Sequence, residues 1–282
     1  MKRKILPLLL VLSSLILAGC RRSLVTSESS LEESSSEVIS SESSSKEVSS
    51  EESSSETSSS SEDNHYTGYY SSITYDMEGA TLLANLQTLM FPTHSYYPSY
   101  GEIRYEFDDS DKDPNNENNI ICFYSHQSMP SAWDPNVYNR EHVWPQSKSA
   151  GLYPSTNNSY SGPGSDLHHV RPAKVSENSE RGNSRFGDFV PNNNVKGDCA
   201  RIVMYMYMHY CSNVAGTGNK RSQYTAALKL SDVFTNYSLL KSWNELDPVD
   251  ELEIARNEYC YKYQGNRNPF IDHPEWIDKI SL

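Results

Sequence analysis

Hydrophobic positions along the chain follow helical spacing in some segments and strand spacing in others. Leucine and methionine side chains recur at helical spacing from Thr81 to Met90, which predicts a helix that packs through its leucine face and ends at Phe91-Pro92. The alternation from Glu102 to Phe107 and the apolar run from Ile120 to Ser125 are both typical of strands. The pattern therefore predicts a domain that mixes helices with short strands.

Two further helices are predicted in the C-terminal third. The segment from Cys199 to Cys211 is apolar on nearly every face, so it should be buried. Asp247-Pro248 offers an N-cap and a first-turn proline for a helix that runs to about Gln264, where Gly265 ends it as the C′ residue. The polar run Asn266-Arg267-Asn268 then either faces a functional site or packs as a C-terminal arm.

Two polar segments are expected to be irregular. Gln146 to Ser165 is rich in Gly, Pro, Ser and Asn, which predicts a surface loop. The acidic run from Asp108 to Asn116 invites comparison with a calcium loop. An EF-hand, however, needs glycine at its sixth position and glutamate at its twelfth, where this chain has Pro114 and Ile120. We therefore expect an acidic turn between two strands.

The N-terminus carries the pattern of an exported lipoprotein. Met1-Lys2-Arg3-Lys4 is followed by an apolar run from Ile5 to Leu17, too short for a transmembrane span, and then by Leu17-Ala18-Gly19-Cys20. Small residues before a cysteine match a lipobox, which predicts a signal peptide over residues 1–19 and a lipid on Cys20. The protein would then be extracytoplasmic and anchored to the bacterial cell membrane. Ordinary signal-peptide cleavage with an incidental cysteine is the alternative.

Serine and glutamate dominate residues 20–65, which have almost nothing apolar to bury, so we expect a flexible tether. The remaining residues, 66–282, suffice for one domain. The chain has a formal charge of −13, and once the tether and the basic N-terminus are subtracted, 26 acidic and 18 basic residues remain. This net charge of −8 argues against a wholly basic nucleic-acid binder. The segment from Arg140 to Arg185 is nevertheless net +2, so phosphate contacts should concentrate there.

Four cysteines remain besides Cys20, and export permits disulfide bonds among them: Cys122, Cys199, Cys211 and Cys260. Cys199 and Cys211 lie on one predicted helix, roughly 18 Å apart along its axis, so they cannot pair with each other. Two of the three pairings survive, as does the case in which all four cysteines are free and buried.

Candidate chemistry is concentrated between Asn139 and Ser147, where Arg140, Glu141 and His142 are consecutive. Hydrolysis of a phosphodiester needs a base that takes a proton from the attacking water and a metal ion that holds the phosphate. It also needs a positively charged group that stabilises the negative charge developing in the transition state. The three residues are of suitable types, although neighbouring side chains on a strand point to opposite faces. An exposed polar turn is the alternative.

Two later segments extend this motif. Asp166 to Pro172 predicts a short strand closed by proline, and Val175 to Asn183 predicts a short helix that ends at Gly182. Asn178 and Arg181 are three residues apart, so they share a face of that helix. A strand, a long loop, a second strand and a short helix follow one another in the order of a ββα-metal site.

With these segments the chain resembles the bacterial endonuclease I family of ββα-metal (His-Me finger) nucleases. The likeness extends from about Tyr75 to Trp276 and implies an α+β fold around that motif. Ordered matches are much more specific than any single motif. Five stretches carry the likeness in order: Asp111 to Asn116, Asn139 to Ser147, Asp166 to Pro172, Asn178 to Asn183 and Gln264 to Asp272.

The resemblance implies a role for each site residue. His142 would be the general base, and Glu141 and Asn178 would be ligands of one metal ion. Arg181 shares a helix face with Asn178, which makes it the second catalytic candidate, as a contact to the phosphate. Oxygen ligands suit a hard cation, so Mg²⁺ is expected, with Ca²⁺ and Mn²⁺ as alternatives. Further candidates for substrate binding are Arg140, Gln264, Arg267 and Asn268.

The protein implied is a lipid-anchored, monomeric endonuclease that acts on DNA without sequence specificity, with RNA open as a second substrate. One rival is a zinc-dependent phosphoesterase that binds its metal ion through His142, His168 and His169. Adjacent residues of a strand face opposite ways, however, so at least one of His168 and His169 should have a structural role. The other rival is a non-catalytic adhesin, whose binding face the 20 tyrosines would suit. An adhesin, however, has no need of a carboxylate, histidine and asparagine arranged for metal chemistry.

Overall fold

The structure, a computed structural model, describes residues 64–282 apart from Ser155 and residues 213–223. The predicted signal peptide, Cys20 and the tether as far as residue 63 lie outside the described residues. The helices and strands, in chain order, are α1 Gly79–Thr93, α2 Ile103–Ser110, β1 Asn119–Cys122, β2 Gln127–Pro130, β3 Tyr138–His142, β4 Val170–Lys174, α3 Val175–Arg181, α4 Lys196–Tyr210, α5 Tyr237–Leu246, α6 Glu251–Gln264, α7 Pro269–Asp272 and α8 Trp276–Lys279.

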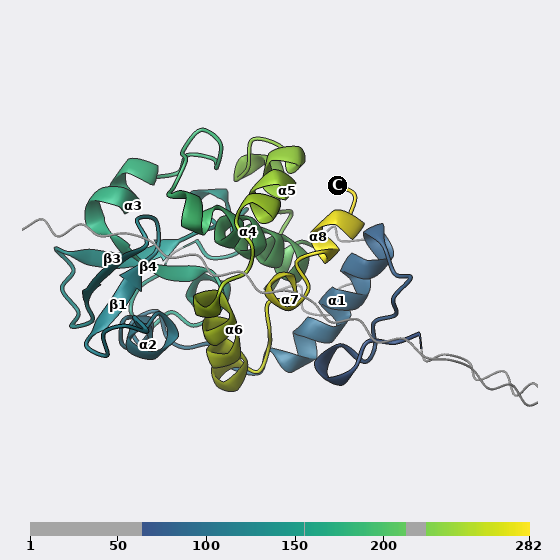
Figure 1. Cartoon of the computed structure of the whole chain (residues 1–282), viewed down its shortest axis with the longest axis horizontal. Coiled ribbons are helices and arrows are strands. Elements are labelled where there is room, and N and C mark those ends of the chain that lie inside the picture. The colour runs from purple at the N-terminus through teal and green to yellow at the C-terminus, as the bar shows by residue number, and fades with distance from the viewer. Residues whose placement is uncertain (1–63, 155, 213–223) are drawn as a thin grey trace, which may run out of the picture. The chain divides into compact units, whose positions relative to one another are not determined.

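Helix α4 is the centre of the main hydrophobic core. It packs against α1, α5 and α7, and nearly all of its side chains are buried. Figure 1 shows α4 between the strands with α2 and α3 on one side and α1, α7 and α8 on the other. The prediction of a buried helix is confirmed, because a helix that is apolar on all faces is stable only when it is surrounded.

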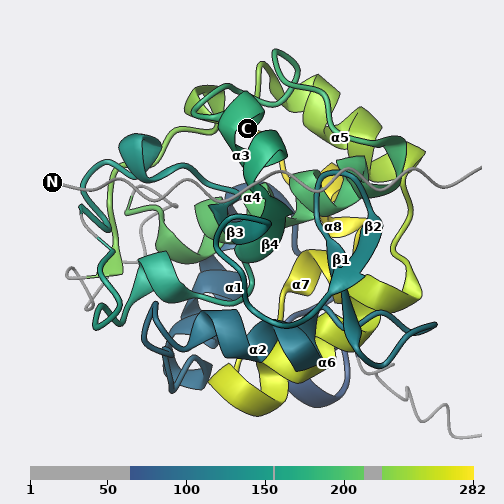
Figure 2. The same cartoon turned by 90° about the vertical axis from the view of Figure 1, so that its left-hand side faces the viewer.

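The four strands form two antiparallel pairs, β1 with β2 and β3 with β4. In the second pair Glu141 lies opposite Arg171 and His142 lies opposite Val170. Helix α3 follows β4 directly and contacts both strands of the pair, which lies in front of α4 in Figure 2. The α+β fold with its ββα unit is therefore confirmed.

Strand β4 is shifted along the chain relative to the prediction. It begins at Val170 rather than Asp166, because Asp166 Oδ1 accepts a bond from the backbone nitrogen of His168 (2.9 Å) and closes a turn over residues 166–169. Pro172 lies inside the strand, where its carbonyl oxygen accepts a bond from Phe123 (2.8 Å).

The strand predicted from Glu102 to Phe107 was wrong, because this segment belongs to helix α2. Ile103 and Phe107 are both completely buried, and residues four apart share a helix face as readily as alternate residues share a strand face. The missed signal is Ser99 with Glu102. The backbone nitrogen of Ser99 donates to the Glu102 carboxylate and the backbone nitrogen of Glu102 donates to Ser99 Oγ, the reciprocal pair of a capping box. The acidic turn therefore follows a helix, not a strand.

Two helix boundaries and one loop differ from the predictions. Helix α1 continues through Pro92 to Thr93. Helix α6 starts at Glu251 because Asp250, not Asp247, is its N-cap and accepts a bond from Glu253 N (2.9 Å). The segment from Gln146 to Ser165 is only partly a surface loop, since it buries Leu152, Tyr153 and residues 163–165. Gly265 ends α6 in the left-handed conformation, as predicted.

The four cysteines are all free and buried in the structure, so of the alternatives left open the unpaired one is observed. None of the helices in the described ranges combines the length and the apolar composition of a bilayer-spanning segment.

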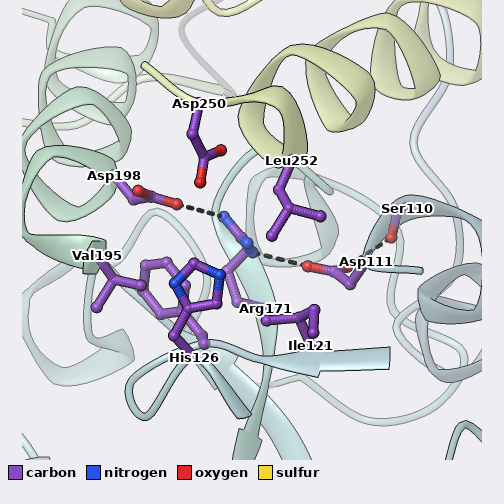
Figure 3. A pocket seen from close by; sticks show the side chains of 10 residues that line it. Ser110, Asp111, Ile121, His126, Arg171, Val195, Asp198, Asp250 and Leu252 are labelled. Carbon is purple, nitrogen blue, oxygen red and sulfur yellow. Dashed lines mark hydrogen bonds and ion pairs between the residues drawn. The ribbon is translucent and has the colours of Figure 1, made fainter. Parts of the chain in front are cut away.

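A buried network of charges is centred on Arg171 of β4 (Figure 3). The Arg171 guanidinium lies between Asp111, whose carboxylate is 2.9 Å from Nε, and Asp198 at 3.6 Å. Arg256 from α6 pairs with the second oxygen of the Asp111 carboxylate. The acidic turn therefore binds two arginines and joins α2, β4 and α6.

Candidate active site

The predicted catalytic residues line one cavity of about 200 Å³ between β3 and α3. Glu141 and His142 are the last two residues of β3, and Asn178 and Arg181 extend from α3. Although neighbours on a strand face opposite ways, both β3 residues reach the cavity at the end of the strand. The remaining lining residues are Arg140, Pro145, Gln146, Gly182 and Asn183.

The Glu141 carboxylate is held by two side-chain donors on the same oxygen. Oε1 accepts the Tyr124 hydroxyl at 2.5 Å and Arg181 Nη1 at 3.1 Å. Glu141 is only 3% exposed, and this burial raises its pKa to about 7, although Arg181 and Tyr124 oppose the shift. A buried carboxylate of this kind is stabilised in its charged form by a cation.

Asn178 is oriented by Asn139, a residue that the sequence did not single out. Asn178 Nδ2 donates to Asn139 Oδ1 at 2.6 Å, so the oxygen of the Asn178 amide is the atom that remains for a ligand. Asn139 lies two residues before Glu141 on β3 and therefore on the same face. Strand alternation within the motif was the signal that could have identified it.

His142 has one nitrogen engaged and one left for chemistry. Its Nε2 is 2.8 Å from the carbonyl oxygen of Gly164, which can only accept, so Nε2 carries a proton and Nδ1 is the basic nitrogen. The ring stacks on Tyr100 and Tyr153 with centroids 5.2 and 5.4 Å away. Burial, with a contribution from His169, lowers the pKa of His142 to about 3, which keeps the imidazole neutral at physiological pH.

The two arginines at the cavity differ in their freedom to meet a phosphate. Arg181 is 1% exposed and donates to the Glu141 carboxylate and, at 2.7 Å, to the carbonyl oxygen of Val143. Arg140 is half-buried, with its guanidinium 3.8 Å from the centre of the Tyr100 ring. It also donates to the Tyr100 carbonyl and to Asn158.

The three C-terminal candidates do not line this cavity. Gln264 and Asn268 are completely buried. Gln264 donates to Asp166 (2.8 Å), and Asn268 accepts a bond from Phe270 N (3.0 Å) as the N-cap of α7. Arg267 forms ion pairs with Glu258 and Asp272. Of the two alternatives for this tail, the structure shows the packed arm, because each of these side chains has partners within the protein.

His168 and His169 bind backbone carbonyl groups rather than a common centre. Their Nε2 atoms lie 3.1 Å from the oxygen of Asn266 and 2.9 Å from the oxygen of Pro163. Between residues 64 and 282, excluding the segments that the structure does not describe, no three His, Cys, Asp or Glu side chains are grouped to hold a metal ion. The three-histidine zinc site therefore does not form among the described residues.

Asp166 is the buried acceptor at the centre of this region. Its Oδ2 accepts the hydroxyl groups of Tyr205 and Tyr210, each at 2.6 Å. Burial raises the pKa of a carboxyl group, but here His94, His168 and the tyrosine bonds outweigh burial and lower the pKa of Asp166 below its usual range. Asp166 directly follows the turn Pro163–Ser165, in which the Gly164 carbonyl accepts the bond from His142.

The β3–β4–α3 unit, with a carboxylate, an imidazole and an amide at one cavity, defines a ββα-metal nuclease core. Comparison with known sequences agrees, because the Endonuclease I profile matches residues 79–190 and 188–275. The chain belongs to the endonuclease I family, whose members generally depend on a divalent metal ion.

Similar proteins are secreted or periplasmic nucleases. The chain is 39% identical over 211 residues to the extracellular ribonuclease of Bacillus subtilis (strain 168), a match that covers 64% of this chain and 68% of the relative. It is 38% identical to the extracellular ribonuclease of Bacillus amyloliquefaciens over the same shares. It is also 30% identical over 129 residues to the periplasmic deoxyribonuclease of Aeromonas hydrophila, covering 38% of this chain and 47% of that protein.

The donor set of the cavity fits a hard divalent cation. Glu141 supplies a buried carboxylate and Asn178 an amide oxygen, both of which are ligands that Mg²⁺, Ca²⁺ and Mn²⁺ accept. Magnesium in particular binds through one or two protein ligands and keeps several waters, for which a cavity of about 200 Å³ has room.

Proposed function

We propose that this chain is an extracytoplasmic endonuclease that depends on a divalent metal ion, most simply Mg²⁺, and hydrolyses DNA and RNA without sequence specificity. The observation that carries the proposal is the meeting of Glu141, His142 and Asn178 at one cavity of the ββα unit. Relatives named ribonuclease and deoxyribonuclease support both substrates.

His142 is assigned as the general base. A neutral imidazole whose Nε2 proton is held by the Gly164 carbonyl presents Nδ1 to a water molecule and accepts its proton. Glu141 and Asn178 are the residues that would hold the metal ion, which when bound stabilises negative charge on the phosphate. Arg140 is the better candidate for a phosphate contact, because it is half-buried whereas Arg181 is 1% exposed and donates through both Nη atoms within the protein.

Digestion of plasmid DNA and of RNA, with and without a chelator, tests the proposal. An external water needs no ribose 2′-hydroxyl, so both substrates should give fragments with 5′-phosphate and 3′-hydroxyl ends, and the chelator should stop the reaction. Cyclic 2′,3′-phosphate ends would contradict the role of His142. Complete absence of cleavage would favour a non-catalytic adhesin instead.

Activity should decline as the pH falls below about 7. The pKa of Glu141 is raised to about 7, so its carboxyl group is increasingly protonated below that pH and a proton competes with the metal ion for it. The pKa of His142 is lowered to about 3, so the base itself stays competent in this range. Raising the magnesium concentration should therefore move the acid limb of the rate profile to lower pH. An acid limb that is independent of magnesium would contradict this assignment.

The lipid anchor on Cys20 is part of the same proposal and rests on the lipobox and the Ser/Glu-rich tether. We expect Cys20→Ser to release the protein from the membrane fraction or to leave it unprocessed, as judged by fractionation and mass. A variant that is cleaved normally and stays membrane-bound would contradict lipidation.

A further inference from the structure

We propose that Tyr124 is a positioning residue for the metal ligand Glu141, so that the affinity of the nuclease for its divalent cation depends on the tyrosine hydroxyl. The inference rests on the proposed function to the extent that Glu141 is taken as a ligand. Its basis is the bond of 2.5 Å from the Tyr124 hydroxyl to Glu141 Oε1.

The two donors to Glu141 use the same oxygen. Tyr124 and Arg181 Nη1 both bind Oε1, and a carboxylate oxygen has two lone-pair sites. The two side-chain bonds therefore occupy Oε1, and we assign Oε2 as the oxygen that meets a cation. They also restrict rotation of the carboxylate, because the donors approach from different elements, the segment after β1 and helix α3.

Tyr124 is itself rigidly placed. It is 3% exposed, and its ring packs against Phe123 and Phe189 with centroids 5.1 Å away in each case. Its carbonyl oxygen accepts a bond from Asn192 at 3.2 Å. A phenol cannot follow a moving carboxylate from such a position, so it fixes one orientation of Glu141.

Removing the hydroxyl should therefore weaken metal binding while leaving both metal ligands in place. Without Tyr124, Arg181 is the remaining donor to Oε1, and the carboxylate is free to turn toward that guanidinium. Loss of an outer partner of a metal ligand typically weakens metal affinity by roughly ten- to a hundredfold.

The experiment compares Tyr124→Phe with Tyr138→Phe in the full chain. Tyr138 is a matched control, because it is also completely buried and its hydroxyl donates at 2.5 Å, but to the carbonyl of Ser131. Calorimetric titration with Mg²⁺ in the absence of nucleic acid should show roughly ten- to a hundredfold weaker binding for Tyr124→Phe and unchanged binding for the control. Excess Mg²⁺ should restore its cleavage rate.

Unchanged magnesium affinity in Tyr124→Phe would overturn the proposal, and so would equal losses of magnesium affinity in Tyr124→Phe and Tyr138→Phe. A third contrary outcome is that Tyr124→Phe weakens magnesium binding as much in a Glu141→Ala background as it does in the wild-type protein.

A second readout needs no substitution at Tyr124. In wild-type protein labelled with ¹³C in its tyrosine rings, Mg²⁺ should shift the Tyr124 signal and leave that of Tyr138 in place, and an unmoved Tyr124 signal also counts against the proposal. If magnesium binding depends on Tyr124 but the protein cleaves no nucleic acid, the proposed nuclease function is refuted and the positioning role of Tyr124 is not.

Discussion

Replacement of His142 by alanine should lower the rate of phosphodiester cleavage by roughly a hundred- to ten-thousandfold, the typical contribution of a general base. The physical reason is that Nδ1 of a neutral, fixed imidazole is the proton acceptor proposed for the attacking water. Magnesium binding should be largely retained, since the assigned ligands Glu141 and Asn178 are unchanged. Rates of plasmid nicking at saturating magnesium, together with calorimetric titration, measure the two effects separately.

Two further measurements make this test specific. Added imidazole should restore part of the activity of His142→Ala, because the substitution leaves a space between the rings of Tyr100 and Tyr153 that a free imidazole can fill. His65→Ala is a suitable control, since His65 is exposed and does not line the cavity. Near-normal nicking by His142→Ala would remove this residue from the role of base.

The ββα unit could be predicted because its information is local. Glu141, His142, Asn178 and Arg181 lie within two short segments whose strand and helix signals are clear, and the structure brings all four to one cavity. Local information failed at α2, where Ile103 and Phe107 satisfy both a strand and a helix pattern. There the reciprocal bonds between Ser99 and Glu102, in the turn just before α2, are the local signal that favours a helix.

The rest of the site depends on contacts between distant parts of the chain. Tyr124 lies 17 residues before the carboxylate it binds, and nothing in the apolar run from Ile120 to Ser125 marks one tyrosine as a donor to a metal ligand. Gln264 is as polar as any substrate-binding residue, yet it packs against Asp166, 98 residues away. Sequence spacing cannot separate a buried amide from an exposed one when its partner is that remote.

The buried charge network of Asp111, Arg171 and Arg256 gives the second large prediction, which concerns stability. Asp111 is 4% exposed, and its carboxylate pairs with Arg171 (Figure 3) and with Arg256, both of which are also buried. Removing one partner from a buried ion pair leaves uncompensated charge in a region of low polarity and costs about 3–5 kcal/mol. Asp111→Asn keeps the shape of the side chain and removes its charge, so we expect the free energy of unfolding to fall by about that amount.

Urea unfolding of Asp111→Asn and of Asp188→Asn separates this effect from the loss of a charge as such. Asp188 pairs with Arg185 at 2.9 Å, but both side chains are about half exposed, so its substitution should change the free energy of unfolding by less than about 1 kcal/mol. None of the network residues Asp111, Arg171, Asp198 and Arg256 lines the catalytic cavity. At urea concentrations well below its unfolding transition, Asp111→Asn should therefore cleave DNA at nearly the wild-type rate. Equal free energies of unfolding for Asp111→Asn and Asp188→Asn would show that the buried ion pairs do not stabilise the fold.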